Sequence, residues 1–186
     1  MGEIGFELYV KIDDSKKLFL TIVNEGKNHN LSLCGAHAMD IMRMESGFLH
    51  WGHDISPEEN QYQAGLQFAI SYKKNINFIG KEALLKIKDQ KQKKLLAMMV
   101  LKDNKPGQPL LLHEEPIYLD DKIIGRTTSG NYSFNFKKNI SFGYVNSGNT
   151  IENLLDKNLS IEIEKKKYPV SSVSYTHLTL PTKPFV

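Results

Sequence analysis

The sequence predicts an α+β protein, in which a mixed α/β segment precedes a small antiparallel β-barrel or sandwich. Helix-like segments occur in the first half of the chain, and a lysine run near residues 91–94 separates the two halves. Short strand-like runs divided by Pro, Gly, Asn and Asp follow. With 186 residues, 40% of them hydrophobic, the chain can form one ordinary domain or two small ones. We expect the division to fall between residues 1–92 and 93–172.

The N-terminal part opens on a strand-like segment. Phe6, Leu8 and Val10 alternate with polar or amphipathic neighbours, which predicts a strand. Residues 15–25 are ambiguous, because LFLTIV favours a strand whereas the Asp-Ser start and the Glu-Gly end suit a short helix. A domain seldom begins inside an element, so we expect further sequence upstream of residue 1.

Three more elements are predicted before the lysine run. In residues 35–45 the apolar Ala38, Ile41 and Met42 fall on one face at i, i+3 and i+4, and Ser46-Gly47 can end the resulting helix. GLQFAISY, residues 65–72, predicts a strand. IGKEALLKIKDQKQKK, residues 79–94, predicts a helix whose lysine-rich end complements the helix dipole.

The C-terminal part consists of short strand-like runs at the spacing of a small antiparallel fold. These runs are LLAMMVL (95–101), PIYLDDKIIGRTTSG (116–130), ISFGYV (140–145) and LSIEIEKKKYPV (159–170). The final residues, 173–186, offer no pairing pattern after a strand that is already complete. We expect them to be a non-native or disordered tail.

Composition argues against several functional classes. The chain has 24 Lys and Arg against 21 Asp and Glu, a net charge of +3, which is typical of a solvated surface rather than of a nucleic-acid footprint. A single cysteine, Cys34, excludes an intrachain disulfide framework and favours a reducing compartment such as the cytoplasm. Its apolar neighbours predict a buried, inert thiol. No apolar run approaches the roughly 20 residues of a membrane span.

The stretch RMESGFLHWGHDIS, residues 43–56, contains two histidines, a tryptophan and two acidic residues within a short span. His50 and His53 lie three apart beside Asp54, a set of residue types that could bind zinc or pack within a folded loop. The histidines follow the predicted helix end at Gly47, so no regular spacing directs them at one point. We therefore expect a packed loop and no metal.

Six motifs occur in one order along the chain. They are GEIGFE (2–7), GAHAMDIMRMESG (35–47), WGHDISPEEN (51–60), AGLQFAI (64–70), FIGKEAL (78–84), and TTSG with GYV (127–130 and 143–145). Together they resemble the folate-binding aminomethyltransferase family, the glycine-cleavage T-proteins. The HWGHDISPE variant is most similar to the C-terminal part of dimethylglycine and sarcosine dehydrogenases.

The resemblance implies an arrangement around tetrahydrofolate, which sits in a central hole of mixed α/β subdomains followed by a β-barrel. Residues 1–92 would be the C-terminal part of the folate-binding domain and residues 93–172 the barrel. The same resemblance implies a helix at residues 15–25. The loop over residues 43–56 would close the hole, with Trp51 shaping its wall.

The resemblance also implies three cofactor-binding residues. Glu7 in GFE would accept two parallel hydrogen bonds from the pterin ring, although the pattern alone makes it an outward strand residue. Tyr144 would reach folate from the barrel, or else pack in the core. Arg126 would pair with the folate carboxylates, or else be a surface arginine.

One position departs from the T-protein pattern. Met39 stands before Asp40 where T-proteins have an arginine, as in the dehydrogenase branch. We do not expect Arg43 to replace that arginine. Arg43 and Glu45 should instead tie the helix end to neighbouring segments.

The resemblance implies a fragment of a larger enzyme rather than a complete one. A flavin domain, with FAD, would lie in missing upstream domains and oxidise a small methylated amine, and tetrahydrofolate would take the one-carbon unit. The family's catalytic aspartate would also lie upstream, so this chain supplies no catalytic residue and should be inactive alone. The alternatives are a stand-alone aminomethyltransferase and a non-catalytic folate-binding module.

Overall fold

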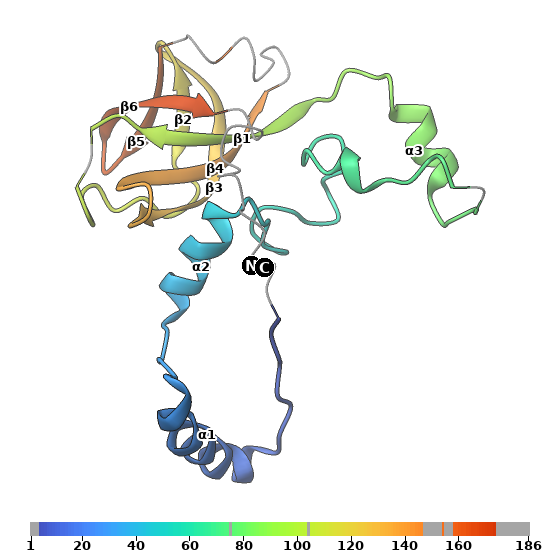
Figure 1. Ribbon diagram of the computed structural model, residues 1–186. Coiled ribbons are helices and arrows are strands. Elements are labelled where there is room, and N and C mark those ends of the chain that lie inside the picture. The colour runs from blue at the N-terminus through green and yellow to red at the C-terminus, as the bar shows by residue number, and fades with distance from the viewer. Residues whose placement is uncertain (1–3, 75, 104, 147–153, 155–157, 174–186) are drawn as a thin grey trace.

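The computed structural model of the chain describes residues 4–74, 76–103, 105–146, 154 and 158–173. Within these residues a barrel carries two extended arms (Figure 1). The helices are α1 (Ile12–Gly26), α2 (Ala36–Glu45) and α3 (Lys81–Ile87), with short 3-10 helices at Lys27–His29 and Gln67–Ala69. The strands are β1 (Lys94–Leu101), β2 (Pro116–Leu119), β3 (Lys122–Ser133), β4 (Lys138–Asn146), β5 (Leu159–Ile163) and β6 (Lys166–Val173). No helix in these ranges is both long and apolar enough to cross a lipid bilayer.

The six strands close into one antiparallel barrel in the order β1-β4-β3-β2-β5-β6. β1 pairs with both β4 and β6, which joins the ends of the sheet. In β5 buried and half-buried residues alternate, as expected when one face of a strand points into a core. The predicted α+β fold with a small antiparallel barrel is therefore confirmed. Closure gives every described strand a neighbour on both sides, whereas a sandwich would leave whole strands at open edges.

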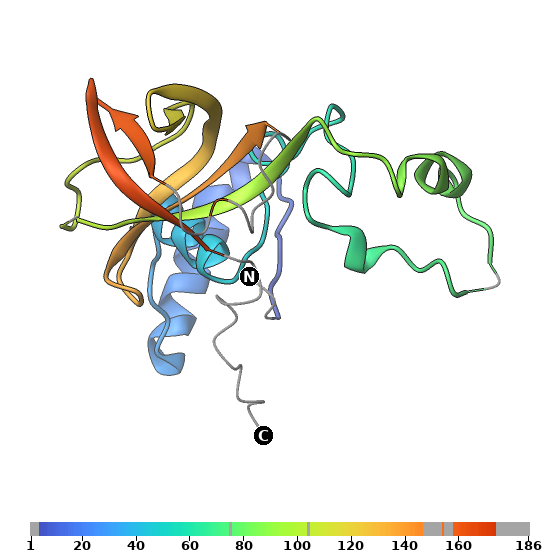
Figure 2. The same ribbon diagram turned by 90° about the horizontal axis from the view of Figure 1, so that it is seen from above.

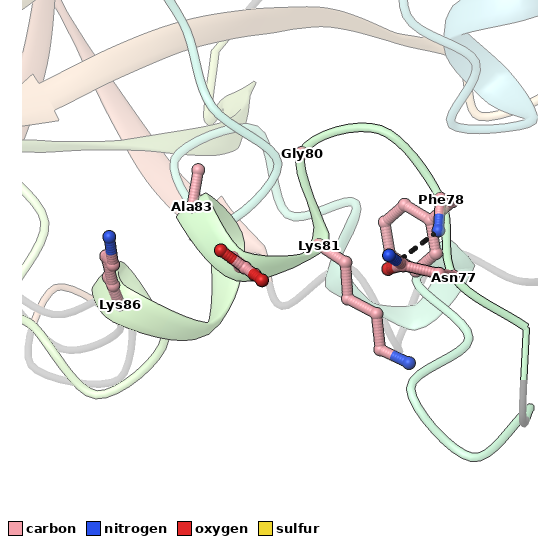
Figure 3. A pocket seen from close by; sticks show the side chains of 7 residues that line it. Asn77, Phe78, Gly80, Lys81, Ala83 and Lys86 are labelled. Atoms are coloured by element: carbon pink, nitrogen blue, oxygen red, sulfur yellow. Dashed lines mark hydrogen bonds between the residues drawn. The ribbon is translucent and has the colours of Figure 1, made fainter.

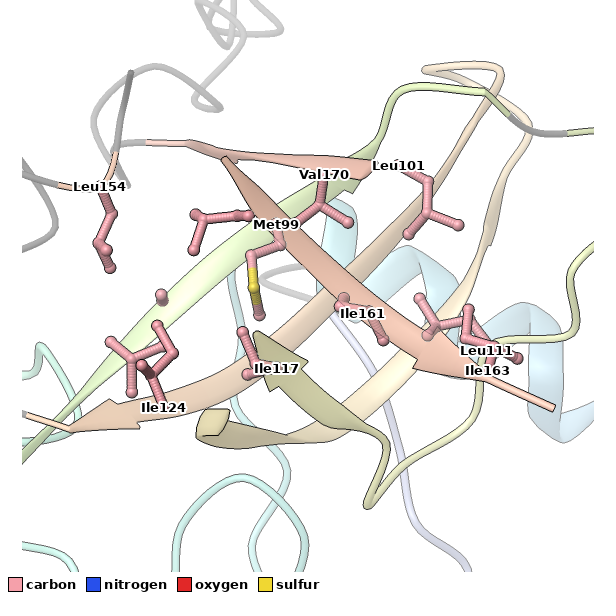
Figure 4. Packing of buried hydrophobic residues seen from close by; sticks show 12 residues of the cluster. Met99, Leu101, Leu111, Ile117, Ile124, Leu154, Ile161, Ile163 and Val170 are labelled. Carbon is pink, nitrogen blue, oxygen red and sulfur yellow. The ribbon is translucent and has the colours of Figure 1, made fainter. Parts of the chain in front are cut away.

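The barrel interior is filled by aliphatic side chains and one methionine. Met99, Ile117 and Ile161 have no exposed surface and point toward one another across the barrel (Figure 4). Burying one such side chain stabilises a fold by about 1.5–3 kcal/mol. The interior is thus a packed core, so a ligand would have to bind outside the barrel.

α2 packs on the outer face of the barrel. Its Ile41 and Met44 form a second apolar cluster with Phe142 of β4 and with neighbouring side chains of β1. Both residues are buried, and the i, i+3 spacing places them on one face of the helix. This cluster is what positions α2 for the polar contacts described below.

The two arms pack little against the barrel. Neither α1 nor α3 contains a buried residue. α1 and the segment 4–11 extend from one side of the barrel and the segment with α3 from another, as both views show (Figures 1 and 2). Phe6, Tyr9 and Ile12 are exposed by 88%, 91% and 85%. A large apolar surface therefore lies open on the N-terminal arm.

The structure confirms some predicted elements and corrects others. The helix implied at residues 15–25 is confirmed as α1, and the helix at 35–45 as α2. The strands predicted at residues 6–10 and 65–72 were wrong. Residues 4–11 are extended but form no hydrogen-bonded pairing with another described strand, and residues 65–72 contain a turn and a 3-10 helix. A strand needs a partner to hydrogen-bond with, and none of the described segments pairs with either stretch.

Two further predictions need correction. The helix predicted over 79–94 spans only Lys81–Ile87. Residues 88–93 form a turn and a connection instead, and Lys94 belongs to β1, where it pairs with Asn146 of β4. Cys34 is exposed rather than buried, since it lies in the connection between α1 and α2, whose residues are exposed throughout. The predicted tail, residues 173–186, lies outside the described residues except for Val173 at the end of β6.

Candidate functional site

Arg43 in the last turn of α2 links the helix to a loop and to the barrel. Its Nη1 donates to Asp54 Oδ2 at 2.5 Å and its Nη2 to Ser129 Oγ at 2.7 Å. Its Nε donates to Asp40 Oδ1 at 2.8 Å, and Nη1 also reaches the Phe48 carbonyl at 3.1 Å. The planar fork of a guanidinium can make all these bonds at once, whereas an ammonium cannot.

Asp54 is the buried counterpart of Arg43. Its side chain is fully buried, and Oδ1 accepts hydrogen bonds from Thr128 Oγ1 at 2.6 Å and Ser129 Oγ at 2.7 Å. Oδ2 also accepts the backbone N–H of His50 at 2.9 Å. A buried carboxylate is tolerated only when its lone pairs are satisfied in this way. The loop that contains Asp54 is thereby held on β3.

Glu45 makes a second attachment of α2 to β3 and the turn after it. Its carboxylate accepts from Ser133 Oγ at 2.5 Å and from Asn135 Nδ2 at 2.5 Å. The prediction that Arg43 and Glu45 tie the helix end to neighbouring segments is confirmed. α2 is therefore fixed in orientation by apolar contacts on one side and by two sets of charged hydrogen bonds.

Tyr144 of β4 joins the same loop from the barrel side. It is half-buried, and its hydroxyl donates to the Asp54 carbonyl at 2.9 Å. Burial, and then the charges of Glu59 and Asp54, raise the pKa of the Tyr144 phenol, so the hydroxyl stays protonated and remains a donor. Lys94 Nζ lies 4.7 Å from the centre of the ring, which is cation–π geometry.

A shallow hollow lies beside this network, between α2, the loop over residues 48–53, the segment before β2, and β3. It has a volume of about 580 Å³, within the range of small-ligand sites. Apolar and aromatic side chains form much of its wall, and Arg43 and Ser129 form its polar base. The lining residues used below are His37, Met39, Phe48, Leu49, His50, Trp51, His53, Leu112 and His113.

Three histidines lie next to one another along one side of this hollow, with their rings tilted or edge-on rather than stacked. The ring centres of His50 and His53 are 4.5 Å apart, and those of His53 and His113 are 6.3 Å apart. Within the described residues no group of three or more His, Cys, Asp or Glu side chains is placed to hold a metal ion. Sequence reasoning singled out His50 and His53 but missed His113, which comes from a segment 60 residues further along the chain.

The three predicted folate contacts are not brought together in this chain. Arg126 and Tyr144 are paired residues of β3 and β4, so these two lie side by side. Arg126 is exposed, and its Nη1 lies 3.3 Å from Glu114 Oε2. Glu7 is exposed on the N-terminal arm, and its Oε2 accepts a hydrogen bond from the Tyr9 hydroxyl at 2.5 Å. None of the three lines the 580 Å³ hollow.

A second hollow, of about 420 Å³, lies at the start of α3 (Figure 3). Residues 77–86 alone line it, and Asn77 Oδ1 accepts the Phe78 N–H at 3.1 Å. Lys81 and Lys86 extend outward from the helix in this view. One short stretch of chain forms this whole hollow, whereas several elements form the hollow against the barrel. The hollow at α3 is therefore the less defined of the two.

Comparisons with known proteins identify relatives of both parts of the chain. A family model described as "GCVT N-terminal domain" matches residues 1–74, and one described as "Glycine cleavage T-protein C-terminal barrel domain" matches residues 93–176. Human mitochondrial dimethylglycine dehydrogenase is 35% identical over 144 residues, which is 77% of this chain and 16% of that protein. A 4-methylaminobutanoate oxidase (formaldehyde-forming) of Paenarthrobacter nicotinovorans is 39% identical over 71% of this chain and 16% of its own length.

Shorter relatives and a solved structure agree. An aminomethyltransferase of Symbiobacterium thermophilum is 36% identical over 77% of this chain and 37% of its own length. The crystal structure of the glycine cleavage system aminomethyltransferase T from Bartonella henselae covers 89% of this chain at a TM-score of 0.69 and 20% identity, and 44% of that chain is matched. This likeness shows that the fold is shared. The chain spans less than half the length of each of these relatives.

Proposed function

Because the chain belongs to the glycine cleavage T-protein family, we propose that it is part of a tetrahydrofolate-dependent aminomethyltransferase module. The parent enzyme is a flavin-linked N-demethylating oxidoreductase of the dimethylglycine or sarcosine dehydrogenase type. Two relatives named as a dehydrogenase and an oxidase of methylated amines support this branch. Met39, at the position where T-proteins have arginine, supports it as well.

The observation that carries the proposal is the hollow between α2 and the barrel. Its volume of about 580 Å³ suits a small organic ligand, and Trp51, Phe48 and Leu112 offer flat or apolar contact surface. Arg43 and Asp54 hold its walls in place through contacts between segments far apart in sequence. A rigid, mostly apolar wall with polar groups at its base fits a flat, polar cofactor such as tetrahydrofolate.

Glu7, Tyr144 and Arg126 are proposed as further folate contacts. The Glu7 carboxylate can accept two parallel N–H groups of a pterin, and its only described hydrogen bond is with the exposed Tyr9. Tyr144 can offer its ring edge to the ligand while its hydroxyl stays on Asp54. Arg126 is the weakest of the three, because its guanidinium already lies near Glu114.

The exposed apolar surface of the N-terminal arm supports the further proposal that other domains of the same polypeptide complete the site. Phe6, Ile12 and Leu33 expose 88%, 85% and 70% of their surface, which is unusual for a stable surface in water. A preceding segment that packs there would bury this surface and enclose the ligand beside Glu7. FAD and the catalytic aspartate belong to such upstream parts in this proposal, and the substrate is a small methylated amine.

Tetrahydrofolate, when bound, would accept the one-carbon unit released from the amine. The residues of this chain would contribute by orienting the ligand: Glu7 at the pterin, Tyr144 along its edge, and the α2 hollow at its other end. None of them is proposed to exchange a proton with the reacting atoms. The isolated chain should therefore bind folate weakly and turn over little.

A stand-alone aminomethyltransferase is the second candidate. The Symbiobacterium relative bears that name and is only 36% identical, a level similar to that of the dehydrogenases. The two candidates differ in whether a flavin-binding domain precedes this segment. We further propose a cytoplasmic location, supported by the single cysteine of the chain.

A titration with a reduced folate tests the proposed function. Calorimetry of the 186-residue chain should detect binding, and Glu7→Gln should weaken it by about tenfold or more, since a carboxylate acceptor contributes about 1.5–3 kcal/mol. Glu25→Gln, at an exposed glutamate of α1, is the matched control and should change nothing. If Glu7→Gln bound the folate as tightly as the unaltered chain, Glu7 would not be a pterin contact. If the unaltered chain bound no folate, the proposed function would be overturned.

A further inference from the structure

Lys94, the first residue of β1, lies against the ring of Tyr144 on the outer face of the barrel. In the ladder between β1 and β4, Lys94 pairs with Asn146. Tyr144 pairs with Leu96, two residues further along β1, so Lys94 and Tyr144 are diagonal neighbours on the same face of the sheet. The Lys94 ammonium lies 4.7 Å from the centre of the Tyr144 ring and 2.5 Å from Glu59 Oε1. It is therefore held between an aromatic ring and a carboxylate.

Glu59 is fixed more firmly than the lysine that it contacts. Its Oε2 accepts hydrogen bonds from the backbone N–H of Ser56 at 2.8 Å and from the Ser56 hydroxyl at 2.6 Å. Its side chain is 9% exposed, against 33% for that of Lys94. A lysine side chain has a long flexible stem and many conformations at a surface. Glu59 therefore selects, among the conformations open to Lys94, the one that places the ammonium over the ring.

Tyr144 is consequently held at two points. Its hydroxyl donates to the Asp54 carbonyl at 2.9 Å, and its ring meets the Lys94 ammonium that Glu59 holds. Because the ammonium covers one face of the ring, a ligand can reach the ring only at its edge or at its other face. A contact group that is already oriented binds more tightly, since less conformational freedom is lost on binding.

We propose that Glu59 and Lys94 are positioning residues for the ligand contact of Tyr144, and that they act through the ring instead of touching the ligand. This inference rests on the proposed function, in which Tyr144 contacts a folate. It adds two residues that sequence reasoning did not single out. Glu59 keeps the ammonium on one face of the ring, and the ring then presents a single orientation to the ligand.

A double-mutant cycle tests this proposal. Calorimetric titrations with a reduced folate would compare the 186-residue chain with Glu59→Gln, Tyr144→Leu and the double variant. Tyr144→Leu should weaken binding about tenfold and Glu59→Gln about threefold, whereas the double variant should bind no more weakly than Tyr144→Leu alone. Glu58→Gln, at the exposed neighbouring glutamate, is the matched control and should bind like the unaltered chain. If Glu59 only supported the fold of the loop, its loss would weaken binding by the same factor with and without the Tyr144 ring.

Two variants of Lys94 separate the position of the ammonium from loss of fold. Lys94→Arg retains a cation that can lie on the ring and meet Glu59, so it should bind within about twofold of the unaltered chain. Lys94→Met should match Glu59→Gln. Proton NMR gives an independent measurement, because the ε-methylene protons of a lysine held over an aromatic face resonate upfield of their usual position. In Glu59→Gln these signals should return toward that position.

The outcomes distinguish failure of the inference from failure of the proposed function. Unchanged Lys94 signals in Glu59→Gln, or an equal loss of affinity with and without the Tyr144 ring, would overturn the inference. If folate binds and depends on Glu7 while the Glu59 and Lys94 variants bind normally, the inference fails and the proposed function stands. If the unaltered chain binds no folate, both fail.

Discussion

Arg43 Nη1 and Asp54 Oδ2 lie 2.5 Å apart, and both side chains are buried at the point where α2, the loop after it and β3 meet. Ser129 of β3 hydrogen-bonds to both members of the pair, so the barrel strand is connected to the helix and to the loop at the same point. The pair is thus a structural junction. Arg43 of the pair, together with Ser129, also forms the polar base of the hollow in which we place the ligand.

Asp54→Asn should destabilise the chain by about 3 kcal/mol, because the buried Arg43 guanidinium then keeps only the partly exposed Asp40 as a charged partner. Urea unfolding followed by tryptophan fluorescence would measure the loss, since Trp51 is the only tryptophan. Asp121→Asn is the control, because Asp121 is exposed where it meets Lys167 at 3.1 Å. That variant should change stability by less than about 0.5 kcal/mol. Similar losses in the two variants would contradict the junction role of Asp54.

Tyr144→Phe should cost about 1–2 kcal/mol of stability, because the Asp54 carbonyl loses the hydroxyl that donates to it at 2.9 Å. The ring and its contact with Lys94 would remain. Thermal unfolding is a suitable measurement. Tyr132→Phe serves for comparison, since its hydroxyl has no hydrogen bond recorded among the described residues, and it should be near neutral. An unchanged melting temperature for Tyr144→Phe would show that the hydroxyl is not an anchor.

Glu59 should make the stability of the chain depend on pH in the acidic range. Burial raises the pKa of Glu59, but hydrogen bonds from Lys94 and Ser56 and the charge of Lys94 outweigh it, so the pKa lies below its ordinary value of 4.5. A carboxyl with a lowered pKa in the folded state adds stability above its unfolded pKa and loses it as pH falls through the folded value. Stability should therefore decline below about pH 4.5. In Glu59→Gln, urea midpoints measured from pH 6 to pH 3 should decline less steeply; identical slopes would exclude this contribution.

Gly125→Ala should destabilise the barrel by about 3 kcal/mol, because an added Cβ would lie 1.9 Å from the Tyr144 carbonyl oxygen on the neighbouring strand. Backbone cannot yield as a flexible side chain can. Gly35→Ala makes a matched control, since a Cβ there meets nothing within 4 Å. Its cost should be about 1 kcal/mol or less, the usual preference for glycine over alanine at a helix N-cap. Chemical denaturation of both variants would decide the comparison.

Local pattern was sufficient for the barrel and for α2. Strands such as Leu159–Ile163 alternate in burial with period two, and turn residues separate the strands. The position of each strand can therefore be predicted from the local sequence. The helix Ala36–Glu45 was predicted as well, but its inward face was not: Ile41 is buried as expected, whereas Ala38 and Met42 are exposed. Met44 is buried instead, because the helix turns that side toward Phe142 of the barrel. The role of Arg43 and Glu45 in tying the helix end was also predictable, because charged residues at a buried helix end require partners.

The sequence by itself determined which segments are strands of a barrel and that residues 36–45 are helical, because both follow from patterns within a short stretch of chain. Only the tertiary structure decided that residues 65–72 form no strand, that Cys34 is exposed and that His113 stands 6.3 Å from His53. These outcomes depend on which segments distant in sequence pack next to the residues in question. Period and propensity describe one stretch of chain at a time, whereas a ladder, a buried surface or a shared hollow requires a second stretch.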